Sequence, residues 1–325
     1  MFNFLRIISV SAVLFFMTAA RVAASPINNN DSLHHPTIEL MGLTEDADSS
    51  FTVPFSRAGN LILIQAKADT IVGNFVLDTG CPHLVLNITY FRDYPLNAAD
   101  EDRNGITGSE FNASQTTVAD FTFGTTHYYK MNADLANLGN IENSKGVKIL
   151  GLIGMELLRD FEMIIDYEEN LIHLHRIGKK EVSTYRSELL ADTSAYSIVP
   201  ISITDNRIMV QTILAGKKIK LVVDSGAETN LLDSRLPDKI FEQVSITGRT
   251  MLSGAGNTKV EVLRGDLRSL MIGNRSIETL PVLITNLEKT CFGYGGCVDG
   301  VLGFDFLSLK KIGFNFVTNK MYVWK

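Results

Sequence analysis

The stretch Asn74-Phe-Val-Leu-Asp-Thr-Gly-Cys81 and its second version, Lys220-Leu-Val-Val-Asp-Ser-Gly-Ala227, decide the fold of this chain. Each is an apolar, strand-like run that ends in an aspartate, a hydroxyl residue and a glycine. An aspartate on the tight loop after a buried strand is held rigidly, and the glycine lets two backbones approach closely. The hydroxyl of Thr79 or Ser225 can hydrogen-bond a neighbouring main chain and brace the loop.

Other segments repeat in the same order at nearly the same spacing. Gly151-Leu-Ile-Gly-Met-Glu-Leu-Leu158 matches Gly300-Val-Leu-Gly-Phe-Asp-Phe-Leu307, and 170–175 matches 319–324. Several spaced matches in one order indicate an internal duplication. The boundaries that this predicts are a signal peptide over 1–24, an N-terminal arm over 25–50, a first lobe over 51–178, a linker over 179–194 and a second lobe over 195–325.

Each copy is predicted to be mostly strand with little helix. Runs such as 61–68 and 208–214 have strand length, and turn residues separate them from the next apolar run. After Gly154 and Gly303, the segments 155–158 and 304–307 fit one short helix each. A closing hairpin turning at Asn170 or Asn319 follows, so each lobe is expected to be a small β-barrel-like unit.

The net charge and the N-terminal segment limit the classes to which this protein can belong. The chain has 325 residues and a formal net charge of −6, so it lacks the basic footprint of a nucleic-acid-binding protein. Residues 7–20 form an uncharged, mostly apolar run after Arg6, and small residues ending at Ala24 fit a signal-peptidase site. Export to the periplasm, the cell surface or the medium is therefore predicted, with no membrane span after the leader is removed.

Three cysteines and six histidines offer little metal chemistry. Cys291 and Cys297 bracket a glycine-rich loop that a disulfide could close, and two free thiols are the equal alternative. No cysteine and histidine spacing is typical of zinc, so neither a metal nor a cofactor is predicted. His173 and His175 share one face of a predicted strand without a third ligand, which favours an ordinary surface strand.

With these motifs in place, the chain resembles the pepsin and retropepsin-like aspartic proteases, and especially the bacterial retropepsin-like type, here as two fused copies. The resemblance implies a mainly β fold of two homologous β-barrel lobes with a short helix each and a cleft between them. It implies that Asp78 and Asp224 form a catalytic dyad. The loop residues Thr79, Gly80, Ser225 and Gly226 would brace the two loops, and Gly154 and Gly303 would support them. Cys81 departs from the family pattern, where alanine, serine or threonine is usual at this position.

The resemblance also implies an activity and its machinery. Two carboxylates sharing one site hold a single proton, and together they activate a water that attacks the scissile carbonyl of a peptide or protein substrate. Hairpin flaps would exclude bulk water, and the candidates are Gly105 with Gly108 and Gly254 with Gly256. Since neither Cys81 nor Ala227 is a good hydrogen-bond donor to the dyad, activity is expected to peak between weakly acidic and neutral pH.

Other interpretations remain beside the protease. A non-catalytic peptide-binding module could keep this fold without its chemistry, and Cys81 with a histidine could form a thiol protease, although no flanking motif supports it. The chain is expected to be a monomer whose lobes pair as an intramolecular pseudo-dimer. A linker over 179–194 is long enough for this, but it also permits pairing between chains.

Overall fold

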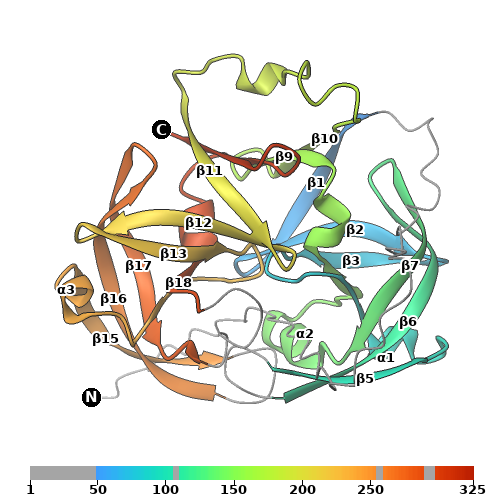
Figure 1. The fold of residues 1–325 in the computed structure, drawn as a ribbon. Helices are drawn as coiled ribbons and strands as arrows, with labels where there is room; N and C mark the ends of the chain where they lie inside the picture. Colours follow the sequence, from blue (N-terminus) through green and yellow to red (C-terminus); the bar gives the residue numbers. More distant parts are fainter. Residues whose placement is uncertain (1–48, 105–109, 254–258, 289–296) are drawn as a thin grey trace, which may run out of the picture.

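Strands dominate the computed structural model, which describes residues 49–104, 110–253, 259–288 and 297–325 (Figure 1). The prediction of a mainly β fold is confirmed. Before the predicted linker lie β1 (Ser50–Ala58), β2 (Leu61–Ala68), β3 (Ile71–Leu77), β4 (Leu84–Asn87), β5 (Asn97–Asn104), β6 (Glu110–Phe123), β7 (Thr126–Ala136), β8 (Gly151–Ile153), β9 (Phe161–Asp166) and β10 (Leu171–Arg176). After it lie β11 (Tyr196–Thr204), β12 (Arg207–Leu214), β13 (Lys217–Val223), β14 (Asn230–Asp233), β15 (Val244–Ser253), β16 (Lys259–Ile272), β17 (Arg275–Thr285), β18 (Gly300–Leu302), β19 (Ile312–Asn315) and β20 (Lys320–Trp324).

The short helices predicted after Gly154 and Gly303 are present as the 3-10 helix η1 (Met155–Leu158) and α4 (Phe304–Leu307). Further short helices that the sequence did not indicate are α1 (Ile88–Phe91), α2 (Gly139–Lys145), η2 (Glu188–Leu190) and α3 (Asp238–Phe241). Helix α2 has an acidic residue in its first turn and a basic one in its last, as the helix dipole favours, and it ends at Gly146 with φ of 67°. None of the described helices is long and apolar enough to cross a membrane.

Strand pairing in the first half has a counterpart in the second half. Strand β2 pairs with β3 and β6, β3 pairs in parallel with β8, and β4 pairs with β7 and β8. In the second half, β12 pairs with β13 and β16, β13 with β18, and β14 with β17 and β18, in the same relative directions. Figure 1 shows these two arrays side by side, the first on the right and the second on the left.

A shared sheet joins the two arrays. Its strands follow the order β1, β10, β9, β19, β20 and β11, with every pairing antiparallel. The two halves meet in its middle, where Ile164 of β9 pairs with Gly313 of β19. The closing hairpins turn at Asn170 and Asn319 as predicted, each with φ of 55°, and both of them belong to this shared sheet. Strands β1 and β11 each run from the shared sheet into their own array.

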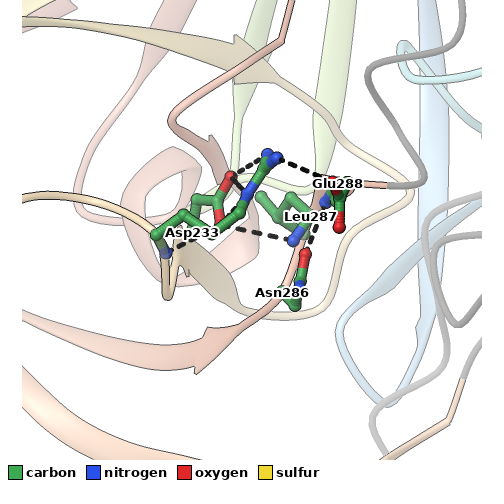
Figure 2. Close-up of polar contacts among 5 residues, drawn as sticks. Asp233, Asn286, Leu287 and Glu288 are labelled. Atoms are coloured by element: carbon green, nitrogen blue, oxygen red, sulfur yellow. Dashed lines mark hydrogen bonds and ion pairs between the residues drawn. The ribbon is translucent and has the colours of Figure 1, made fainter.

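The end of β14 anchors the chain just before the segment that contains Cys291. The buried carboxylate of Asp233 accepts hydrogen bonds from the backbone N–H of Arg235 at 3.0 Å and of Leu287 at 3.4 Å, and the Arg235 guanidinium pairs with it (Figure 2). Beyond this segment, Cys297 is disulfide-bonded, whereas Cys81 is free. Cys291 itself lies outside the described residues.

Candidate active site

Asp78 and Asp224 occupy equivalent places in the two arrays. Asp78 directly follows β3, and its backbone N–H donates to the carbonyl of Ile153 in β8 at 3.0 Å. Asp224 directly follows β13, and its N–H donates to the carbonyl of Leu302 in β18 at 2.9 Å. Both carboxylates are buried, at 1% and 0% exposure. Each one is therefore fixed by a central strand and the parallel neighbour of that strand.

The hydroxyls of Thr79 and Ser225 join the two loops reciprocally. The N–H of Thr79 donates to Ser225 Oγ at 3.0 Å, and the N–H of Ser225 donates to Thr79 Oγ1 at 2.9 Å. Each hydroxyl then donates across the junction, Thr79 to the carbonyl of Val223 at 3.1 Å and Ser225 to that of Leu77 at 2.8 Å. These four buried hydrogen bonds bring together the two loops that carry the carboxylates.

Gly80 and Gly226 are packed directly against the carboxylate of the opposite half. A Cβ atom at Gly80 would stand 2.3 Å from Asp224 Oδ2, and one at Gly226 would stand 2.5 Å from Asp78 Cγ. Neither distance leaves space for a side chain. The N–H of Gly80 also donates to Asp78 Oδ1 at 3.0 Å, and the N–H of Gly226 to Asp224 Oδ1 at 2.8 Å. The two glycines thus place both carboxylates at one junction.

Gly154 and Gly303 lie against the main chain that follows each motif. A Cβ at Gly154 would stand 2.1 Å from the carbonyl oxygen of His83, and one at Gly303 would stand 2.5 Å from that of Ala227. The next residue in each case donates its N–H to the same loop, Met155 to Cys81 and Phe304 to Ala227, both at 2.8 Å. Glycine is needed here because two backbones touch.

Burial dominates the electrostatics of the paired carboxylates. It raises the pKa of Asp78 well above the ordinary value, and the neighbouring charge of Asp224 raises it further. Burial also raises the pKa of Asp224, to about 6, against the lowering effect of its hydrogen bonds and of the Arg207 guanidinium. A side-chain hydrogen bond between the two carboxyls also raises the pKa of Asp78 and lowers that of Asp224, as expected when the pair shares a proton. The pair therefore holds a proton at pH values where an exposed aspartate is fully ionised.

A second pair of contacts between the halves was not anticipated from the sequence. Asn60, in the turn between β1 and β2, donates its side-chain amide to the carbonyl of Glu228 at 2.9 Å. Asn206, in the turn between β11 and β12, donates in the same way to the carbonyl of Pro82 at 3.2 Å. Each asparagine reaches the loop four residues past the opposite aspartate. A signal existed, because both positions obey the spacing of 146 residues that separates Thr79 from Ser225.

The thiol-protease alternative finds no support in this geometry. Burial raises the pKa of the Cys81 thiol well above the ordinary value, whereas a nucleophilic cysteine needs a lowered one. Cys81 Sγ donates to the carbonyl of His83 at 3.2 Å, and the His83 ring is paired with Glu156 at 2.8 Å. Within the described part of the chain, no cluster of three or more histidine, cysteine or acidic side chains could hold a metal.

The flap candidates themselves, Gly105 with Gly108 and Gly254 with Gly256, lie outside the described residues. The strands that lead to them form long antiparallel pairs. Strand β5 pairs with β6 up to Asn104 and Glu110, and β15 pairs with β16 up to Ser253 and Lys259. Each candidate therefore falls between two paired strand ends.

The reciprocal hydroxyl contacts give a direct prediction. Thr79→Val removes the donor to Val223 and the acceptor for Ser225, so two buried main-chain groups lose their partners. At about 1–3 kcal/mol for each such group, the free energy of unfolding should fall by about 2–6 kcal/mol. Urea denaturation measures this, and Thr79→Ser, which keeps the hydroxyl, should stay close to wild type. Equal stability of the valine and serine variants would contradict a bracing role for the hydroxyl.

Comparisons with known proteins agree with the fold. A family model described as Aspartyl protease matches residues 210–306, which include Asp224 and Gly303. The whole fold is similar to the crystal structure of an aspartic proteinase from Irpex lacteus, with a TM-score of 0.50 and 13% sequence identity over 85% of this chain and 97% of that one. The fold is that of an aspartic proteinase. No curated protein matches the chain. Since the family model covers the second half only, a role for Asp78 depends on its geometry.

Proposed function

We propose that the chain is an aspartic endopeptidase that hydrolyses peptide bonds with a water activated by Asp78 and Asp224. The observation that carries this proposal is the pair of buried carboxylates joined through Thr79 and Ser225. The similarity of the fold to an aspartic proteinase and the match to the aspartyl protease family over the second half support it. A peptide-binding module without chemistry would not need two carboxylates buried at a cost in stability.

The proposed reaction uses the one proton that the pair retains. The ionised carboxylate takes a proton from a water held between the two side chains, and the protonated carboxyl hydrogen-bonds to the scissile carbonyl. The oxygen of the water forms a bond to the carbonyl carbon, which gives a tetrahedral intermediate. Proton transfer to the leaving amine then breaks the carbon–nitrogen bond. No nucleophile from the protein and no metal takes part in this scheme.

The remaining parts of the proposal concern the protein as a whole. We propose that it is exported after removal of residues 1–24, and that its halves are copies of a retropepsin-like unit that pair within one chain. The one-to-one correspondence of strand pairings supports the duplication. The shared sheet supports pairing within the chain, since β9 and β19 are neighbours in it.

The function is tested by incubating the purified protein with a mixed peptide library and identifying products by mass spectrometry. Cleavage at internal bonds is expected from the wild-type protein. Retention of peptides without cleavage, over the whole range from pH 3 to pH 8, would favour the non-catalytic module instead. Mass spectrometry of the mature N-terminus tests the predicted cleavage after Ala24.

The dependence of activity on pH follows from the raised pKa values. Below the first ionisation of the dyad both carboxyls are protonated and no base is available. The rate should therefore rise as pH increases through the pKa of Asp224, about 6, and fall again when the second proton is lost. A profile of kcat/KM against pH is expected to peak between weakly acidic and neutral pH. A maximum below about pH 3, typical of a strongly acid-shifted dyad, is the contrary result.

A further inference from the structure

Arg207 begins strand β12, which pairs with the strand β13 that leads to Asp224. In the antiparallel pair of β12 and β13, Ile208 is opposite Val223. Continuing this register by one residue sets Arg207 opposite Asp224, the position at which Cα atoms are about 4.5–5.5 Å apart. Arg207 begins β12 immediately after Asn206, whose side chain contacts the loop of the other aspartate. The backbone of Arg207 therefore lies at the junction of the two halves.

The side chain of Arg207 is buried, at 6% exposure. Burial lowers the pKa of Arg207, and the groups that oppose this are, largest first, Cys81 of the other half, Asp205 and Asp224 of its own half, and Asp78 of the other half. Asp134 is a further acidic group near Cys81. Burial of a cation is costly unless anionic groups surround it. The Cys81 thiol stays neutral because burial raises its pKa, which leaves the aspartates as the anions that can balance Arg207.

The first half has no equivalent cation. There, Leu63 pairs with Val76, and the same register sets Leu61 opposite Asp78. Leu61 is buried at 3% exposure and packs in an apolar cluster with Cys81 and Val85. The two aspartates thus occupy matching backbone positions but face different neighbours, a leucine on one side and an arginine on the other. This difference breaks the symmetry of the pair.

We propose that Arg207 is a positioning residue that holds Asp224 as the carboxylate and leaves the shared proton on Asp78. On the proposed function, on which this inference rests, Asp224 is then the base that takes the proton from water. Asp78 is the acid that hydrogen-bonds to the substrate carbonyl. The charge of Arg207 acts on both carboxyls but more strongly on Asp224 than on Asp78, so it favours the ionised form of Asp224. The assignment of the two roles follows from one residue difference between the halves.

The first test titrates the two carboxyls without any substrate. The side-chain carboxyl carbons of ¹³C-aspartate-labelled protein are followed by NMR from pH 3 to pH 9, and Asp78→Asn and Asp224→Asn identify the two resonances. In the wild-type protein, Asp224 should ionise at lower pH than Asp78. Ionisation of Asp78 first would overturn the assignment. Because no cleavage is needed, this result stands apart from the success or failure of the proposed protease activity.

The second test changes the cation. Arg207→Met keeps the length of the side chain and removes its charge, so the first ionisation of the pair should move up by about 1–2 pH units. Arg207→Lys keeps the charge and should restore most of the wild-type value. Leu61→Met is the matched control on the other side and should leave the titration unchanged. An unshifted titration in a folded Arg207→Met protein, or equal shifts in the methionine and lysine variants, would rule out an electrostatic role.

If the protein cleaves peptides, the same variants give a kinetic readout. The acid limb of the kcat/KM profile should move to higher pH in Arg207→Met and return towards wild type in Arg207→Lys. A uniform loss of rate at every pH, with the limb in place, would indicate a structural role for Arg207 and contradict the proposal. If Arg207→Met does not fold, the lysine variant and the order of ionisation in the wild-type protein still distinguish an electrostatic role of Arg207 from a structural one.

Discussion

Replacing either Asp78 or Asp224 with asparagine should lower kcat by about 10³-fold or more while the protein stays folded. Each variant loses a proton acceptor or donor for the activated water, a role worth about 10²–10⁴ by itself. The asparagine amide keeps an oxygen for the N–H of Gly80 or Gly226, so the loop geometry is retained. The loss should be as large for Asp78, which lies outside the family match, as for Asp224.

Measurements of stability distinguish a loss of catalysis in these two variants from a loss of folding. Burial raises the pKa of both carboxyls, so their ionisation costs free energy as pH rises through those values. A neutral asparagine avoids that cost, and at pH 7 the melting temperature of either variant should be no lower than that of wild type. Asp120→Asn, at a partly exposed aspartate paired with Lys67 and His127, is the control that should keep full activity. Retained cleavage in Asp78→Asn or Asp224→Asn would remove that residue from the dyad.

Adding a single methyl group at Gly226 or Gly80 should also lower the rate of peptide cleavage, and it should lower the stability of the protein as well. The added Cβ of Gly226→Ala would meet Asp78 Cγ at 2.5 Å, and that of Gly80→Ala would meet Asp224 Oδ2 at 2.3 Å. One carboxylate must move to make room. A displacement of about 1 Å at reacting groups costs about 10² in rate, and overpacking of a buried site costs about 1–3 kcal/mol of stability. Peptide cleavage rates and urea denaturation of both variants measure the two effects.

The control for this prediction is Gly178→Ala, because the nearest atoms to a Cβ at that position lie 3.9 Å away. It should match wild type in rate and in denaturation midpoint. If Gly226→Ala retained both the rate and the stability of wild type, the carboxylate of Asp78 could not be packed against this loop, and the junction described above would be wrong.

The parts of the site that could be predicted from the sequence are those that need particular residues. Close approach permits glycine alone at four positions, with a carboxylate side chain at positions 80 and 226 and with backbone at 154 and 303, so the motifs stand out against their surroundings. The turns at Asn170 and Asn319 were predictable for a similar reason, since positive φ favours asparagine over most residues. The short helices after Gly154 and Gly303 began where the repeated segments placed them.

Features that depend on distant pairing could not be predicted. The central contact of β9 with β19 joins strands from opposite halves. The pattern of apolar and polar residues in either strand does not indicate which strand it pairs with. Asn60 and Asn206 are ordinary turn residues in sequence, and only the tertiary structure brings them to Glu228 and Pro82. Arg207 follows Asp205 and Asn206, a polar run typical of an exposed turn, yet its side chain is buried beside the dyad.

The central claim is that one aspartate from each half of a single chain completes the active site. The most direct test mixes equal amounts of Asp78→Asn and Asp224→Asn, lets them refold together, and measures peptide cleavage against wild type. Pairing within one chain predicts that the mixture is as inactive as either variant alone. If halves instead exchanged between chains, roughly a quarter of the wild-type rate would return, because mixed dimers would each contain one intact pair. Recovery of that activity would contradict the claim.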